Sequence, residues 1–279
     1  MGADRARLLH ALSTNHIQQL KLGQGCYAFF LNAQGHIQAD ANLFCLEDRF
    51  LLDTELETRE KLLRLVDKYI IADDVTLEDV TEKLASVAVE GLRAAQLLGG
   101  MGAPAPEQDY AHAAWGDARI ARVSVTGAPG FRIFMPAETR ADWIARLESA
   151  GAVEAKPEDA RIVRLEHGKP RYGEDIFDTT LPQETQQMHA VHFTKGCYLG
   201  QEIVERIRSR GHVNRLLVKL EFDGTELPAK GAKVFADSAE AGEITSSAFS
   251  PALGKVVALA YVRAQYAAAP VSLSSPPAR

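Results

Sequence analysis

The chain has 279 residues, and its 37 acidic and 31 basic residues give a formal net charge of −6. With 46% hydrophobic and 24% charged residues, it has an ordinary globular composition, which excludes the disordered, collagen-like and membrane classes. Three cysteines without a CxxC pair predict neither a disulfide framework nor a cysteine-rich zinc site. No segment has the pattern of a signal core or a membrane-spanning helix, so we expect a cytoplasmic protein.

The first quarter of the chain predicts a helix followed by an antiparallel meander. Apolar residues follow one helical stripe over residues 8–20, after which glycines change the period. Three strand-like runs come next, at 26–31, 36–46 and 49–52. The turns between them are short enough for hairpins. Thr54 and Glu57 then form a capping-box pattern that predicts a helix over 55–70.

The middle of the chain mixes further strands and helices. The expected elements are two strands within 73–89, a helix at 91–98, a hairpin of 119–126 with 131–135, and helices at 140–149 and 157–167. A Gly- and Pro-rich stretch at 99–106 is the strongest break in the pattern. Because strands and helices alternate without βαβ regularity, the pattern favours an α+β fold over a doubly wound sheet.

The last part of the chain predicts a separate β domain. Alternating apolar residues and Gly or Pro turns indicate four strands within residues 213–263. The Ala-, Ser- and Pro-rich residues 267–279 are expected to form a flexible, solvated tail.

The segment 195–202 contains the most reactive chemistry of the sequence. We expect Cys197 to lie near a helix N-terminus beside Lys195, and both features lower the pKa of a thiol and make it a nucleophile or metal ligand. An inert buried cysteine is the alternative.

A run without acidic residues extends from Arg206 to Leu220. Its basic residues are Arg206, Arg208, Arg210, Arg215 and Lys219. The run predicts a patch that attracts polyglutamate, phosphate or an RNA backbone, and a solvated helix face is the alternative.

Two carboxylates occupy unusual positions. Asp40 lies in the middle of a predicted strand, and Glu166 lies at the unfavourable end of a helix dipole. His189 and His192 have a spacing that suits a metal on a helix, but no third ligand accompanies them, so we expect no metal site.

The octapeptide KGCYLGQE at 195–202 resembles the signature KGCYxGQE of YgfZ-type folate-binding proteins, which are relatives of the glycine-cleavage T-protein, an aminomethyltransferase. Blocks similar to this family cover nearly the whole chain, among them GCYAFFLNAQGHIQAD and RLEHGKPRYGEDI. The resemblance implies three subdomains around a folate-sized opening. Residues 1–206 would form the first two, and 213–263 would form a small C-terminal β-barrel.

The resemblance also implies roles for individual residues. Asp40 matches the second position of an acidic pair that carries catalysis in the T-protein, and Ala39 replaces the first. Glu166 matches a pterin-binding glutamate, and Tyr27 matches a tyrosine of the hairpin block. Cys197, which the T-protein lacks, would be the reactive group that Lys195 keeps charged.

Three functions follow as hypotheses. The resemblance implies a protein that binds tetrahydrofolate and supports assembly or repair of iron–sulfur clusters, including those of enzymes that thiomethylate tRNA, with Arg206 and its neighbours attracting the glutamate tail of folate. A tetrahydrofolate-dependent aminomethyltransferase is the second hypothesis, and a scaffold or RNA-binding adaptor is the third. We expect a monomer. The family usually has a further strand before the block that begins near Ala3, and its absence is expected to affect folate affinity.

Overall fold

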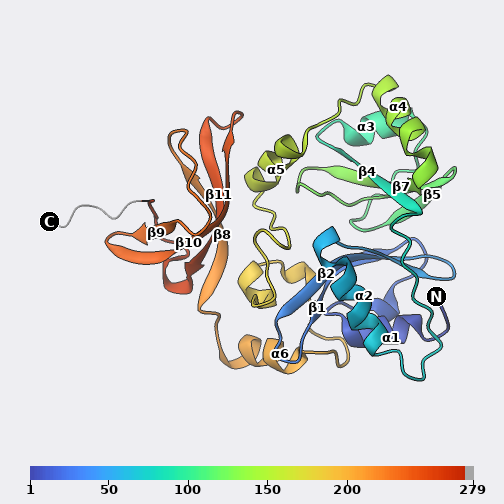
Figure 1. Cartoon of the computed structure of the whole chain (residues 1–279), viewed down its shortest axis with the longest axis horizontal. Helices are drawn as coiled ribbons and strands as arrows, with labels where there is room; N and C mark the ends of the chain where they lie inside the picture. The colour runs from blue at the N-terminus through green and yellow to red at the C-terminus, as the bar shows by residue number, and fades with distance from the viewer. Residues whose placement is uncertain (274–279) are drawn as a thin grey trace.

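The computed structural model describes residues 1–273, apart from the side chain of Arg210. It contains three antiparallel sheets, each built from a different part of the chain (Figure 1). No helix within this described part is long and apolar enough to cross a membrane.

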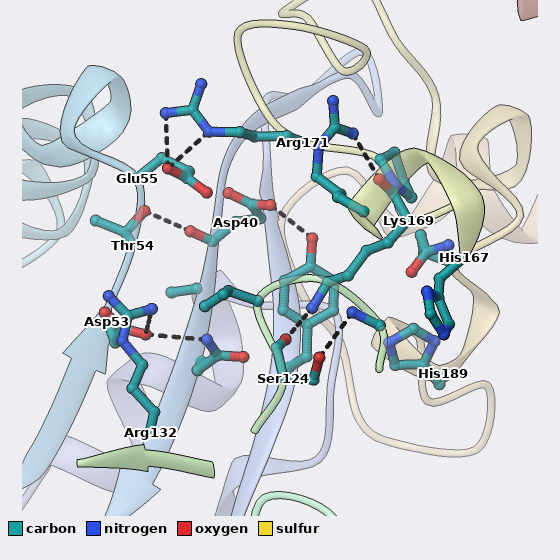
Figure 2. A pocket seen from close by; sticks show the side chains of 18 of the residues that line it. Asp40, Asp53, Thr54, Glu55, Ser124, Arg132, His167, Lys169, Arg171 and His189 are labelled. Atoms are coloured by element: carbon teal, nitrogen blue, oxygen red, sulfur yellow. Dashed lines mark hydrogen bonds and ion pairs between the residues drawn. The ribbon is translucent and has the colours of Figure 1, made fainter. Parts of the chain in front are cut away.

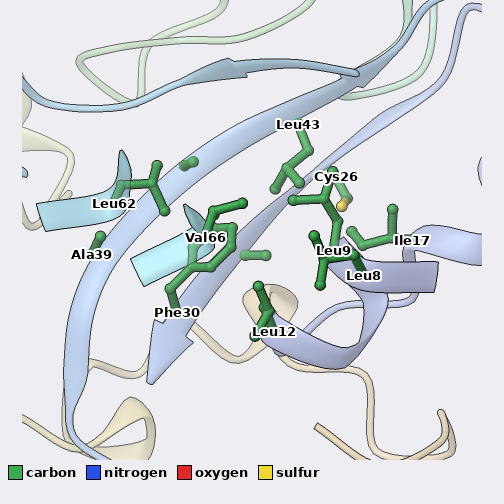
Figure 3. Packing of buried hydrophobic residues seen from close by; sticks show 12 residues of the cluster. Leu8, Leu9, Leu12, Ile17, Cys26, Phe30, Ala39, Leu43, Leu62 and Val66 are labelled. Carbon is green, nitrogen blue, oxygen red and sulfur yellow. The ribbon is translucent and has the colours of Figure 1, made fainter. Parts of the chain in front are cut away.

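The first sheet is the predicted meander. Its strands are β1 (Gly25–Leu31), β2 (Ile37–Cys45) and β3 (Phe50–Asp53), in the order β1-β2-β3. One face packs against α1 (Arg5–Leu12) and α2 (Arg59–Lys68), and its core includes Leu9, Phe30, Leu43 and Val66 (Figure 3). The other face, with Phe29, Leu31 and Ile37, packs against residues that come much later, between 172 and 204. Strand alternation therefore buries both faces of this sheet.

Two details of this region differ from the sequence prediction. The helix expected over 8–20 ends at Leu12, because the Thr14 N–H bonds to the Phe29 carbonyl of β1 and Ser13 forms a bridge with Phe30, and a short 3₁₀ helix follows at Ile17–Gln19. The Thr54 hydroxyl bonds to the Asp40 carbonyl and the Thr58 hydroxyl, so it does not cap the next helix. That helix begins as a 3₁₀ turn at Leu56–Thr58 and continues as α2.

The second sheet has the strand order β4-β7-β6-β5. Its strands are β4 (Leu84–Glu90), β5 (His112–Trp115), β6 (Ala118–Ala121) and β7 (Gly130–Pro136). The helices α3 (Ala94–Gly100) and α4 (Arg140–Ser149) pack on it through Leu98, Trp143 and Leu147. Residues 73–89 hold one strand and not two, and the short β5 was not predicted, because four residues give too little alternation to identify.

The third sheet is the predicted C-terminal β domain. Its strands are β8 (Arg215–Phe222), β9 (Lys233–Ala236), β10 (Ala239–Ser250) and β11 (Lys255–Arg263), in the order β8-β11-β10-β9. Ala269, Val271 and Leu273 pack against its core, so the predicted tail at 267–279 is packed as far as residue 273. Residues 274–279 lie outside the described residues.

Helix α5 (Pro157–Glu166) lies between the third sheet and the rest of the molecule (Figure 1). Its Leu165 packs against β8 and β11, while Arg164 pairs at 2.7 Å with the fully buried Asp175. Asp175 also accepts hydrogen bonds from Thr245 and Ser246 of β10. Because every charge in this network is paired, it links three chain segments without an isolated buried charge.

Helix α6 (Gln201–Arg210) precedes the third sheet, and two short 3₁₀ helices, Pro182–Thr185 and Met188–Ala190, lead towards it.

Candidate functional site

A cavity of about 340 Å³ opens between the first sheet, the turn at 124–127, the loop after α5 and the segment near residue 189 (Figure 2). The polar side chains that line it are Tyr27, Asp40, Asn42, Asp53, Thr54, Glu55, Tyr110, Ser124, Arg132, Arg164, His167, Lys169, Arg171, Gln187 and His189. Its volume lies at the lower end of the range found for small-molecule sites.

Asp40 is the most distinctive group in this cavity. Its side chain is 8% exposed, and its Oδ2 accepts a 2.6 Å hydrogen bond from the Tyr27 hydroxyl. Its Oδ1 is buried without a hydrogen-bond partner among the described residues. Burial raises the pKa of Asp40 to about 6, although the Tyr27 hydrogen bond acts in the opposite direction. A carboxylate with a pKa near neutral pH can accept and return a proton during a reaction.

The strand register explains why Asp40 and not residue 39 faces the cavity. Successive side chains on β2 point to opposite faces, and Ala39 is fully buried in the core beneath the helices. A carboxylate at position 39 would therefore be buried among apolar side chains.

Three arginines at the cavity are neutralised by carboxylates on other segments of the chain. Arg132 pairs with Asp53 at 2.8 Å, and Arg171 pairs with Glu55 at 2.9 Å. Arg164 pairs with Asp175, as described above. Sequence reasoning missed these arginines, because each partner lies on a separate element and no local pattern connects them.

Lys169 is the remaining strong cation of the cavity. Its Nζ donates to the Ser124 carbonyl, and burial lowers its pKa. The carbonyl is held in place because Glu90 accepts hydrogen bonds from the backbone of Val125 and from the side chain of Thr126. Lys169 lies within the block RLEHGKPRYGEDI, but the sequence analysis attached no role to it.

Three rings from separate segments form a stack at the cavity wall. The ring of His189 lies 5.5 Å from that of Tyr27 and 6.4 Å from that of Tyr110, with interplanar angles of 26° and 19°. Burial lowers the pKa of His189, so its imidazole is neutral at pH 7. The stack therefore offers a flat and uncharged surface to a ligand.

Glu166 does not line this cavity. Its carboxylate accepts a hydrogen bond from the Ser250 hydroxyl of β10, on the side of α5 that faces the third sheet. Arg164, two residues earlier, lines the cavity instead, since side chains two apart on a helix point in nearly opposite directions. The Glu166 carboxylate therefore contacts the subdomain of the third sheet, and its expected contact with a pterin stays a prediction.

Lys195 and Cys197 also lie outside the cavity, and they do not act as the predicted pair. The Lys195 side chain is 6% exposed and donates to the carbonyls of His10 and Ser13, with Nζ 2.6 Å from the Ser13 oxygen. Cys197 is exposed, and α6 begins four residues later at Gln201. Lys195 therefore anchors its loop to the end of α1.

Among the described side chains, three basic residues of the run from Arg206 onward pair with glutamates, which lowers the net charge of the predicted patch. Arg206 is exposed on α6 and does not line the cavity. Glutamates from the same or other segments pair with its neighbours: Glu205 with Arg208, Glu184 with Arg215, and Glu221 with Lys219. Folding therefore places glutamates beside basic residues whose own stretch of sequence contains no acid.

The two histidines with metal-binding spacing lie in different places. His189 stacks on Tyr27, whereas His192 contacts the ring of His16 at 5.1 Å. Within the described part of the chain, no group of three or more His, Cys, Asp or Glu residues is arranged to hold a metal ion.

Comparisons with known proteins agree with this fold. Residues 1–195 match the family described as the GCVT N-terminal domain, and residues 215–273 match the glycine cleavage T-protein C-terminal barrel domain. The chain therefore belongs to the glycine cleavage T-protein family. This result confirms the predicted α+β aminomethyltransferase-like fold with a C-terminal barrel domain.

Individual relatives are aminomethyltransferases. The one from Rubrobacter xylanophilus is 33% identical over 269 residues, which cover 94% of this chain and 72% of the relative. The one from Thermus thermophilus is 30% identical over 270 residues, which cover 94% of this chain and 75% of the relative. The solved structure of the glycine cleavage system aminomethyltransferase T from Bartonella henselae has a TM-score of 0.82 at 25% identity, with 95% of this chain and 75% of that chain covered.

Proposed function

We propose that this protein binds tetrahydrofolate in the cavity and transfers to it the methylene carbon of an aminomethyl group carried on a lipoyl sulfur. The carbon would form bonds to two folate nitrogens, while the amino group leaves as ammonia and the sulfur as a thiol, which take up the two N–H protons of folate. The observation that carries the proposal is Asp40, a buried carboxylate that lines the cavity and has one oxygen without a hydrogen-bond partner among the described residues. Its position matches the acidic pair of the T-protein, and the relatives named above are aminomethyltransferases.

The residues of the cavity suit a reduced pterin. A pterin is flat and has ring N–H donors beside a carbonyl oxygen. The stack of Tyr27, His189 and Tyr110 matches the flat ring, and Asp40 Oδ1 is an acceptor for an N–H group. Bound tetrahydrofolate would supply the nitrogens that accept the one-carbon unit.

Asp40 would act at Oδ1 as the proton acceptor for the folate amine. The Tyr27 hydroxyl donates to Oδ2 and leaves Oδ1 without a partner among the described residues. With a pKa of about 6, the carboxylate is mostly ionised at pH 7 and still basic enough to take a proton.

The direct test is anaerobic calorimetry with tetrahydrofolate, followed by turnover with an aminomethyl group carried on lipoyl. We expect saturable binding and turnover by the wild type, and Asp40→Asn should lower turnover by about 10² to 10⁴-fold, the usual contribution of a general acid or base. Asp223→Asn is the matched control, since the Asp223 side chain is 95% exposed in the third sheet's subdomain. Full turnover by Asp40→Asn would refute the role of Asp40, and absence of folate binding would refute the proposal.

A second candidate function rests on Cys197, which is exposed and belongs to the YgfZ-like motif. Under this hypothesis the protein uses folate to support iron–sulfur enzymes, such as those that thiomethylate tRNA. Cys197→Ser would then abolish that support in cells and leave folate affinity unchanged. Under the aminomethyltransferase proposal, the same variant retains full turnover, because Cys197 does not line the cavity.

A further inference from the structure

Lys169 differs from the other strong cations of the cavity in having no acidic partner. Each of the three arginines pairs with a carboxylate within 3 Å. Among the described residues, no carboxylate oxygen lies within ion-pair distance of the Lys169 ammonium. An ammonium has three N–H groups, and Lys169 uses one of them on the Ser124 carbonyl. Its remaining donors are available to a ligand.

The structure around Lys169 holds this ammonium in place. Gly127 has a φ of +90° and packs against the loop after α5, where an added Cβ would lie 2.8 Å from the Cβ of His167 and 3.6 Å from that of Lys169. The neighbouring turn is fixed by Glu90, as described above. A larger residue at 127 would push the loop away, so the close approach requires glycine.

Lys169 and Asp40 line the same cavity, and their side chains extend into it from opposite sides (Figure 2). Each charge partly offsets the effect of burial on the other group: Lys169 opposes the rise in the pKa of Asp40, and Asp40 opposes the fall in the pKa of Lys169. Together the two side chains offer a ligand one charged acceptor and one charged donor.

We propose that Lys169 determines ligand specificity by donating to the 4-oxo oxygen of the pterin while Asp40 accepts from the adjacent ring N–H. This inference rests on the proposed function. In a reduced pterin the 4-oxo group is flanked by N–H groups at N3 and N5, so an acceptor and a donor stand next to each other on the ligand. Lys169 and Asp40 provide the complementary pair.

The consequence is discrimination against 4-amino pterins. Replacing the 4-oxo oxygen by an amino group turns an acceptor into a donor, which faces the Lys169 ammonium. The Lys169 ammonium and the 4-amino group would then face each other as two donors, and both would lose a buried hydrogen bond. A hydrogen bond to a charged group corresponds to about 10- to 100-fold in affinity.

The experiment is anaerobic calorimetry with tetrahydrofolate and with its 4-amino counterpart, tetrahydroaminopterin. The proteins are the wild type, Lys169→Met, Lys169→Arg and the control Lys255→Met, whose ammonium lies on β11 away from the cavity. We expect the wild type and the control to prefer tetrahydrofolate by at least about tenfold. Lys169→Met should lose about tenfold for tetrahydrofolate only, so that both ligands bind equally, while Lys169→Arg keeps the preference.

The outcomes separate this inference from the proposed function. If the wild type binds neither ligand, the proposed function fails, and the inference fails with it. If the wild type binds tetrahydrofolate but does not discriminate, or if Lys169→Met loses affinity for both ligands alike, only the inference is overturned. The preference of the wild type is measured without any variant, so the test holds even where a substitution prevents folding.

Discussion

At the scale of single residues, the site is defined by two polar side chains, Asp40 and Lys169, each of which lacks one partner within the described part of the chain. Asp40 has one oxygen bonded to Tyr27 and one without a partner, and Lys169 has an ammonium without a carboxylate among the described residues. The Glu166 carboxylate contacts Ser250, and the Lys195 ammonium contacts the end of α1. Arg206 is exposed on α6. Of the site residues predicted from the sequence to act in catalysis, only Asp40 therefore lines the cavity.

The raised pKa of Asp40 predicts a pH-dependent cost to stability. The pKa is 3.8 in the unfolded chain and about 6 in the fold, so ionisation of this group lowers the free energy of unfolding as pH rises from 4 to 6. The rise corresponds to about 3 kcal/mol. In urea denaturation, the free energy of unfolding of Asp40→Asn should rise relative to that of the wild type from pH 4 to 6. Above pH 7 the difference between the two proteins should stay constant. A difference that does not change with pH would contradict the raised pKa.

Glu166 supplies a second prediction at this scale. Because its carboxylate bonds to Ser250 and does not line the cavity, Glu166→Gln should bind tetrahydrofolate within about twofold of the wild type. The replacement retains an oxygen that can accept from the serine hydroxyl. Calorimetry checks this, and a loss of tenfold or more would restore the pterin contact implied by the resemblance.

At the scale of elements, Lys195 anchors the loop 195–200 to α1. The sequence predicts a different role for this lysine, the activation of the Cys197 thiol. Lys195 is directed at the backbone carbonyls that end α1, where a helix dipole favours positive charge. We expect Lys195→Met to lower the free energy of unfolding by about 1.5 to 3 kcal/mol, the contribution of hydrogen bonds to a charged group. Urea denaturation measures this, with Lys255→Met as the exposed control, and unchanged stability would show that the anchor is dispensable.

How far the elements could be predicted depends on how local their cause is. Residues 26–52 form strand-like runs rich in apolar residues and divided by short turns, so the meander follows from local rules, as do the strands after residue 215. Asp40 pairs with Phe29 across the sheet, which places Tyr27 diagonally beside it, within reach of a long side chain. The contacts of Lys169 with Ser124 and of Arg171 with Glu55 span 45 and 116 residues, and no local pattern predicts them.

At the scale of the whole molecule, the third sheet is joined to the rest through a buried polar network in addition to the apolar packing of Leu165 against β8 and β11. Arg164, Asp175, Thr245 and Ser246 form that joint, and each member depends on the others for its hydrogen bonds. Such a joint holds the parts in one arrangement only while all its members are present.

Removing the central carboxylate should loosen this joint. Asp175→Ala leaves the buried Arg164 guanidinium with only one of its two carboxylates, Glu174 at 2.7 Å, and we expect the free energy of unfolding to fall by about 1 to 3 kcal/mol. Differential scanning calorimetry should then show the third sheet melting separately, before the other two. The control Asp223→Ala, at a side chain that is 95% exposed, should melt as the wild type does. A single transition at the wild-type temperature for Asp175→Ala would contradict the proposed joint.

The double-sided burial of the first sheet has a consequence for synthesis on the ribosome. Phe29, Leu31 and Ile37 are covered by residues between 172 and 204, which emerge long after the strands that need them. A nascent chain that has reached residue 150 therefore exposes an apolar sheet face, and the wall formed by Tyr27 and His189 does not yet exist. Chaperones that bind apolar surface would recognise the incomplete chain. The cavity proposed to bind folate would form only after residues 172–204 have been synthesised.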